Sequence, residues 1–199
     1  EDGTWGLGQC AFGEPVSAFI NTVIAPIIEG QNCMAIEHLN DLIVRVSQRF
    51  GTSGTASTAM SGVDLALWDL KGKILNQPVY SLLGGPVRES ITCYATSDDL
   101  DWSQELGFTK FKITNPSHYS DGDAGIKAVI DHVSQARECV GAEHDLMINP
   151  VMSYNFEFAQ RLLEHLRPYN LRWLEEPLVP TDNDGLARLR KSAPWVAIA

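Results

Sequence analysis

From about Ser90 to the end of the chain, short apolar segments alternate with amphipathic segments at intervals of about 25–30 residues. The amphipathic segments carry apolar residues at helical spacing, and the apolar segments have the length of strands. The expected strands are at residues 91–96, 108–113, 145–150, 171–175 and 196–199. Strict alternation of strand and helix indicates βαβ units and a parallel sheet. Five strands and four helices would form a doubly wound sheet or the first half of an eight-fold barrel.

Residues 1–88 lack this alternation and are expected to form a separate α+β domain, with the sheet domain at 89–199. The elements expected there are the end of a β-meander at 1–13, helices at 15–29 and 36–50, and a loop at 52–59. A third helix is expected to begin at Ser61, with Asp64 completing a variant of the capping box.

The balance of charges argues against several classes of partner. The chain has 25 acidic and 15 basic residues, a formal net charge of -10, which disfavours nucleic acid and anionic membranes. The longest apolar runs are far short of a membrane-spanning helix.

The four cysteines are scattered and form no C-x-x-C, so we expect reduced thiols and a cytoplasmic protein. No glycine-rich phosphate loop follows any strand, which gives nucleotide binding little support.

Polar residues follow three consecutive expected strands. Lys112 comes after the second strand, Asn149 after the third, and Glu175 and Glu176 after the fourth. Taken singly, the lysine would be a surface residue, the asparagine a turn residue and the glutamates a solvated pair. At equivalent strand ends of a parallel sheet, however, they would face one bowl, which is where such folds bind ligands. Oxygen ligands there suit Mg²⁺, and a nearby lysine can act as an electrostatic partner or as a base.

Two stretches carry a family resemblance. Ser61–Lys73, followed by Pro78–Gly85, resembles the cap-to-barrel segment of the mandelate racemase/muconate lactonizing branch of the enolase superfamily. Trp173–Pro177 resembles the fourth-strand metal motif of the same branch. The resemblance implies an α+β cap, incomplete at its N-terminus, followed by the first half of a modified (β/α)7β TIM-like barrel.

The resemblance also implies a chemistry, in which one Mg²⁺ assists removal of the proton α to a carboxylate. By this resemblance Glu175 is a metal ligand and Asn149 matches the third-strand ligand. Lys112 matches the first lysine of a second-strand K-x-K motif, and Glu176 supports the ligands.

Three departures from the family pattern modify this expectation. Thr114 stands where racemases and epimerases of the family carry their second lysine. The absence of that lysine resembles acid-sugar dehydratases of the rhamnonate type. Asn149 replaces an aspartate, so the site loses a negative charge. The chain ends at Ala199, before the family's third metal ligand and a later histidine. We therefore expect a fragment that is inactive by itself.

The leading hypothesis is a Mg²⁺-dependent acid-sugar dehydratase that converts an aldonate to a 2-keto-3-deoxy acid. We expect the intact protein to bind a sugar-acid carboxylate and to form a homo-oligomer. The alternatives are an epimerase or cycloisomerase of the same superfamily, or a non-catalytic homologue with a degraded metal site.

Overall fold

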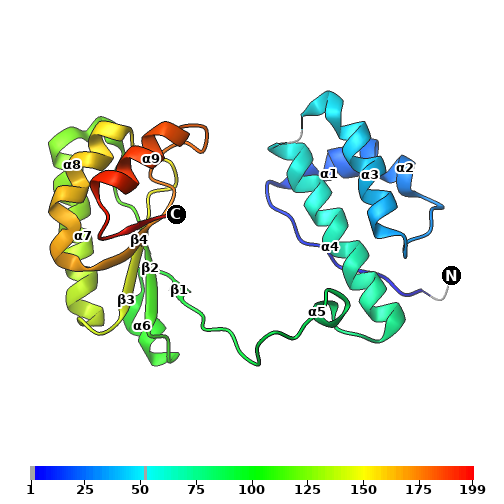
Figure 1. Ribbon diagram of the computed structural model, residues 1–199, viewed down its shortest axis with the longest axis horizontal. Helices are drawn as coiled ribbons and strands as arrows, with labels where there is room; N and C mark the ends of the chain where they lie inside the picture. Colours follow the sequence, from blue (N-terminus) through cyan, green and yellow to red (C-terminus); the bar gives the residue numbers. More distant parts are fainter. Residues whose placement is uncertain (1–2, 52) are drawn as a thin grey trace. The chain divides into compact units, whose positions relative to one another are not determined.

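The computed structural model describes residues 3–51 and 53–199, and the chain divides into two compact units (Figure 1). The first unit extends to Ser90 and the second begins at Ile91. Each has its own cluster of buried apolar side chains, as expected of an independently packed unit. Among the described residues, no helix combines the length and the apolar character needed to cross a membrane.

The first unit is built from helices around one apolar core. Its helices are α1 (Gly13–Phe19), α2 (Ala25–Ile28), α3 (Ile36–Ser47), α4 (Thr55–Leu75) and α5 (Val79–Leu82). A π-helical turn, Ile20–Ile24, joins α1 to α2 without a break. In α3, Ile36, Leu39 and Ile43 recur at helical spacing and are buried in the core, as the sequence pattern predicts.

Helix α4 begins earlier than the sequence suggests, and the expected capping box at Ser61 is wrong. The helix starts at Thr55, so residues 55–59 are helical rather than a loop. Ser61 donates its hydroxyl to the carbonyl of Ser57, 3.0 Å away, as a residue inside a helix does. The reason is tertiary packing: Ala56 and Ala59 are buried, which outweighs the weak helix propensity of the serines and threonines around them.

The expected β-meander is also wrong, because residues 3–10 form no strand. This segment contacts α4, where the backbone N–H of Leu7 donates to Asp69 Oδ2 at 2.7 Å. Two glycines allow the close approach. A Cβ added to Gly8 would lie 1.8 Å from the carbonyl oxygen of Gly62, and one added to Gly6 would lie 2.0 Å from that of Ala66. The glycines that suggested a turn-rich sheet are therefore needed for packing against a helix.

The substitution Gly8→Ala is expected to lower the free energy of unfolding of the first unit by about 2 kcal/mol or more. The added methyl group must displace the backbone of α4, which is rigid. Urea unfolding followed by circular dichroism measures the change. Gln9→Ala, at an exposed neighbouring position, is the matched control and should leave the unfolding midpoint unchanged. Equal midpoints for the two variants would contradict the packing described here.

The second unit contains a five-stranded parallel sheet. Its strands are β1 (Ala95–Thr96), β2 (Lys110–Thr114), β3 (Asp145–Asn149), β4 (Leu171–Leu174) and β5 (Ala197–Ile198). Its helices are α6 (Leu100–Glu105), α7 (Gly122–Val140), α8 (Phe156–Leu166) and α9 (Asn183–Ser192). Residues 91–94 were expected to belong to the first strand, but they lie outside it. The reason is that β2 begins only at Lys110, so the first residue of β1 that has a partner is Ala95, which pairs with Phe111.

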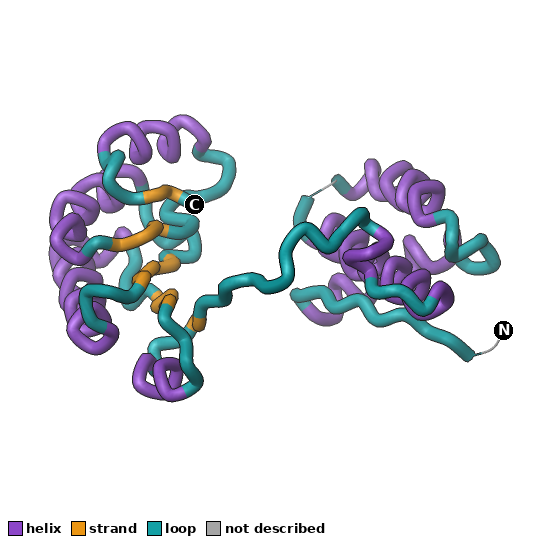
Figure 2. The backbone as a smooth tube through the Cα atoms, turned by 60° about the horizontal axis from the view of Figure 1, so that its bottom comes forward, coloured by secondary structure: helices purple, strands orange, loops and turns teal. Residues whose placement is uncertain are grey.

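The order of the strands distinguishes between the two expected architectures. The strands lie side by side in chain order, β1-β2-β3-β4-β5. A doubly wound sheet reverses direction at a switch point, whereas a barrel adds each strand to the same side of the last. Helices α7 and α8 cover one face of the sheet (Figure 2). The arrangement is that of a (β/α) barrel, as the resemblance implied.

Side chains of β2 alternate between the two faces of the sheet. Phe111 and Ile113 are buried in the core formed with the helices. Lys110, Lys112 and Thr114 therefore project from the opposite face, which in a barrel is the interior.

A register shift between β3 and β4 determines where the last residues of β4 lie. Leu171 pairs with Leu146, and Leu174 pairs with Ile148, so β4 uses one residue more than β3 over this interval. Both leucines of β4 are thereby buried against the helices. The backbone N–H of Glu175 donates to the carbonyl of Ile148 at 2.9 Å, which places Glu175 beside the end of β3.

Candidate active site at the strand ends

The centre of the candidate site is an ion pair between β2 and the end of β4. Lys112 Nζ lies 2.6 Å from Glu175 Oε1, and the two side chains are only 10% and 21% exposed. The ammonium group also lies 5.3 Å from the centre of the Tyr94 ring, within the range of a cation–π contact. The sheet thus brings together the lysine and the glutamate that the sequence predicts to face one bowl.

The environment of Lys112 keeps it charged. Burial acts to lower the pKa of Lys112, but the hydrogen bond and the negative charge of Glu175 outweigh burial, and the pKa is raised above its ordinary value. A lysine that holds its proton at neutral pH is a poor base. Of the two roles expected for it, the arrangement favours the electrostatic one.

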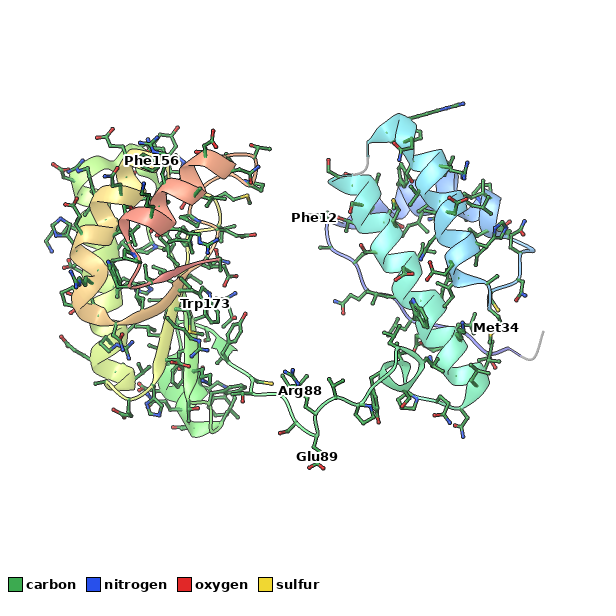
Figure 3. The ribbon with its side chains drawn as sticks, viewed as in Figure 1. Phe12, Met34, Arg88, Glu89, Phe156 and Trp173 are labelled. Carbon is green, nitrogen blue, oxygen red and sulfur yellow. The ribbon has the colours of Figure 1, made fainter. Side chains whose placement is uncertain are left out.

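Asn149 also contacts Glu175, but through its nitrogen. Its Nδ2 donates to Glu175 Oε1 at 3.0 Å, and its Oδ1 accepts the backbone N–H of Val151 at 2.8 Å. The other glutamate oxygen, Oε2, accepts the indole N–H of Trp173 at 2.8 Å. Trp173 (Figure 3) also packs edge-on against Tyr94, with ring centroids 5.4 Å apart. Glu175 is therefore surrounded by donors from β2, β3 and β4.

Glu176 contributes through its backbone. Its N–H donates to the carbonyl of Ala199 at 2.8 Å, and its own carbonyl accepts the N–H of Met152 at 2.7 Å. The residue has a φ of 44°, in the left-handed region. Its exposed side chain makes no hydrogen bond to Glu175 or Asn149 in the described part of the chain. Its support of Glu175 through the side chain stays a prediction.

An aspartate that follows β1, Asp98, lies near the site although it was not among the expected site residues. Asp98 accepts hydrogen bonds from the backbone N–H of Thr114, at 2.9 Å, and from the Thr114 hydroxyl. Burial acts to raise the pKa of Asp98, but these bonds outweigh it and the pKa is lowered. His132 Nε2, on α7, lies 3.5 Å from the same carboxylate. The sequence does carry a signal for this residue, because Asp98 is a polar residue that closely follows a strand, as the other candidate residues do.

A buried hydrogen-bond network supports the loops that follow β2 and β3. The hydroxyl of Tyr154 donates to Asn115 Oδ1 at 2.5 Å, and Asn115 Nδ2 donates to Ser153 Oγ at 2.8 Å. Tyr154 is only 3% exposed, and burial raises its pKa well above the ordinary value. The network holds the loop that carries Val151, the residue that orients Asn149.

The substitution Tyr154→Phe is expected to lower the free energy of unfolding of the second unit by about 1–3 kcal/mol, because Asn115 loses a partner in a buried place. Urea unfolding measures this change. Tyr119→Phe removes the same hydroxyl from a side chain that is 46% exposed and serves as the control. A Tyr154→Phe protein as stable as the control would show that the network contributes little.

As arranged here, these residues do not fit a magnesium ion. No group of three or more His, Cys, Asp or Glu side chains with metal-site geometry occurs among residues 3–51 and 53–199. Both oxygens of Glu175 already accept hydrogen bonds, and Asn149 turns an NH₂ group toward it. Mg²⁺ requires oxygen ligands, and an amide nitrogen is not one of them.

Two family models match the chain, one on each unit. Residues 1–84 match the N-terminal domain of mandelate racemase/muconate lactonizing enzymes, and residues 98–199 match the enolase C-terminal domain-like family. An L-rhamnonate dehydratase from Saccharopolyspora erythraea is 40% identical over 194 residues, which is 98% of this chain and 50% of that protein. The chain thus spans about half the length of the curated relatives it matches.

Solved structures agree with the sequence relatives. A rhamnonate dehydratase from Gibberella zeae complexed with Mg superposes with a TM-score of 0.89 at 30% identity, covering 94% of this chain and 47% of the other. The 3,6-anhydro-D-galactonate cycloisomerase from Zobellia galactanivorans gives the same TM-score and identity, covering 100% of this chain and 56% of the other. With both of its units matched, the chain belongs to the mandelate racemase/muconate lactonizing enzyme branch of the enolase superfamily and is similar to L-rhamnonate dehydratases.

Proposed function

We propose that the protein containing this chain is an acid-sugar dehydratase. Its substrate would be an aldonate, from which it removes the proton α to the carboxylate and expels the β-hydroxyl group. The observation that carries the proposal is the 40% identity to an L-rhamnonate dehydratase across 98% of this chain. The site is consistent with it, because Lys112 supplies a fixed positive charge and Thr114 replaces a second lysine.

In the proposed reaction, a general base other than Lys112 or Thr114 takes the proton from the α-carbon, and the electron pair of the broken C–H bond moves into an enediolate. Lys112 stabilises the negative charge that develops on the enediolate oxygens, because its ammonium is already fixed and partly desolvated. A general acid gives a proton to the β-hydroxyl as the enediolate collapses, so that the C–O bond breaks and water leaves. The resulting enol tautomerises to the 2-keto-3-deoxy acid. Thr114 is hydrogen-bonded to Asp98 and does not serve as the base.

Magnesium is proposed as a cofactor only for the whole protein, because a rhamnonate dehydratase similar to this chain is described as complexed with Mg. The sequence pattern assigns Glu175 and Asn149 to that ion, but as arranged here the two side chains do not fit it. Since Lys112 and Asn149 already occupy that carboxylate, we assign no step of the reaction to the ion. We also propose a homo-oligomer and a cytoplasmic location, the latter because all four cysteines are free.

A panel of aldonates tests the proposal on the full-length protein. Formation of a 2-keto-3-deoxy acid, detected as its semicarbazone, is the expected result for at least one six-carbon or deoxy-six-carbon acid. A Lys112→Met protein serves as the inactive control. The proposal is wrong if the folded full-length protein dehydrates no sugar acid when divalent cation is supplied.

A cycloisomerase or epimerase is the second candidate, favoured by the likeness to the Zobellia galactanivorans cycloisomerase at 30% identity. Such an enzyme would make the same enediolate but lose no water. A third possibility, a non-catalytic homologue, is motivated by Asn149 and would show neither turnover nor metal binding.

A further inference from the structure

We propose that Asn149 and Lys112 close the strand-end site against divalent cations, so that Glu175 rests in a metal-free cluster neutralised by the chain's own donors. This inference goes beyond the proposed dehydratase function and does not depend on it. It concerns the affinity of the site for Mg²⁺, whatever the reaction.

The orientation of the Asn149 amide is determined by its own loop. Oδ1 accepts the N–H of Val151 at 2.8 Å, so rotating the amide by half a turn would set an NH₂ group against an N–H group. The loop is held on both sides, because Met152 N–H donates to Glu176 and Tyr154 N–H donates to Pro177. The donor face of the amide is therefore fixed toward Glu175.

An aspartate at this position would act in the opposite way. One carboxylate oxygen would accept the same N–H of Val151, and the other would face Glu175 as a metal ligand. In the present chain that second atom is Nδ2, which donates to Glu175 Oε1 at 3.0 Å. The amide therefore presents a hydrogen-bond donor to Glu175 where an aspartate would present a metal ligand.

The charges of the cluster give the same result. Lys112 carries one positive charge and Glu175 one negative charge, while Asn149 is neutral, so the three side chains together offer a dication no net negative charge. Lys112 is held at 2.6 Å from Glu175 with only 10% of its side chain exposed. An incoming ion would have to displace this ammonium group and also compete with the indole N–H of Trp173.

Metal binding by the full-length protein, measured without substrate, tests the inference. Mn²⁺ titrations followed by electron paramagnetic resonance, and Mg²⁺ titrations by calorimetry, compare the wild type with Asn149→Asp. We expect Asn149→Asp to bind both ions roughly 100-fold more tightly, because one full negative charge is added within contact distance of the ion.

Asn155→Asp is the matched control. It adds the same charge at the N-cap of α8, where the side chain accepts the N–H of Phe158 and an aspartate caps equally well. Its metal affinity should equal that of the wild type. A wild-type protein that binds Mn²⁺ within about threefold of Asn149→Asp overturns the inference.

A second variant keeps the test independent of how Asn149→Asp folds. Lys112→Met removes the competing cation and should tighten Mn²⁺ binding by at least about tenfold. Unchanged or weaker binding in a folded Lys112→Met protein would equally overturn the inference. Since no turnover is measured, failure here is distinct from failure of the dehydratase proposal.

Discussion

Replacing Lys112 by methionine is expected to reduce the turnover of the full-length protein on its sugar acid by at least about 1,000-fold. Methionine keeps the length and apolar stem of lysine but removes the charge that faces the developing enediolate. Initial rates of 2-keto-3-deoxy acid formation at saturating substrate measure the loss. Because the change affects the transition state, kcat should fall far more than KM rises.

Lys110→Met is the control for this experiment. Lys110 projects from the same face of β2, but it lies two residues away and pairs with Asp145 at 2.5 Å, at the start of β3. Its loss should leave kcat within about tenfold of the wild type. A Lys112→Met protein with the kcat of this control would contradict the assigned role.

The largest effect on stability is expected from Phe111→Ala, the immediate neighbour of Lys112 on the other face of the sheet. Phe111 is fully buried between β2 and the helices, so its truncation should lower the free energy of unfolding of the second unit by about 3–5 kcal/mol. Urea unfolding followed by fluorescence measures this loss.

Leu106→Ala provides the comparison, because Leu106 is 57% exposed and its truncation should cost less than about 1 kcal/mol. A Phe111→Ala protein no less stable than Leu106→Ala would mean that β2 presents the wrong face to the core. That result would also remove Lys112 from the candidate site, since adjacent residues of a strand point in opposite directions.

Most of the sheet unit could be predicted from the sequence. Its strands and helices recur at a steady interval, and each helix carries an apolar stripe that the core requires. The order of the strands could not be derived from that pattern, because both candidate folds share it. Only the family resemblance favoured the barrel, and the observed order agrees.

The first unit was harder to predict because tertiary contacts outweigh its local signals. Serine and threonine residues made the start of α4 look like a loop, although two alanines among them are buried. The glycines at positions 6 and 8 looked like turn residues, although they allow the chain to pass close to α4. In both places the partner lies far away in the sequence.

The candidate site was predictable in position but not in its detailed contacts. The rule that the carboxyl ends of parallel strands meet at one edge of the sheet predicted that Lys112, Asn149 and Glu175 lie close together, and their hydrogen bonds agree. It could not predict that the asparagine presents its nitrogen, because that depends on the N–H of Val151 in a loop with a positive φ. It also did not predict the contact of Trp173, whose indole N–H donates to Glu175, two residues further along the chain.

The most direct test of the proposed function is a proton NMR time course of the full-length protein with its aldonate in D₂O. Dehydration predicts that the α-proton signal disappears only as the signals of a 2-keto-3-deoxy acid appear, with the unreacted substrate unlabelled. Recovery of substrate or its epimer with deuterium at the α-carbon, and no loss of water, would contradict the account.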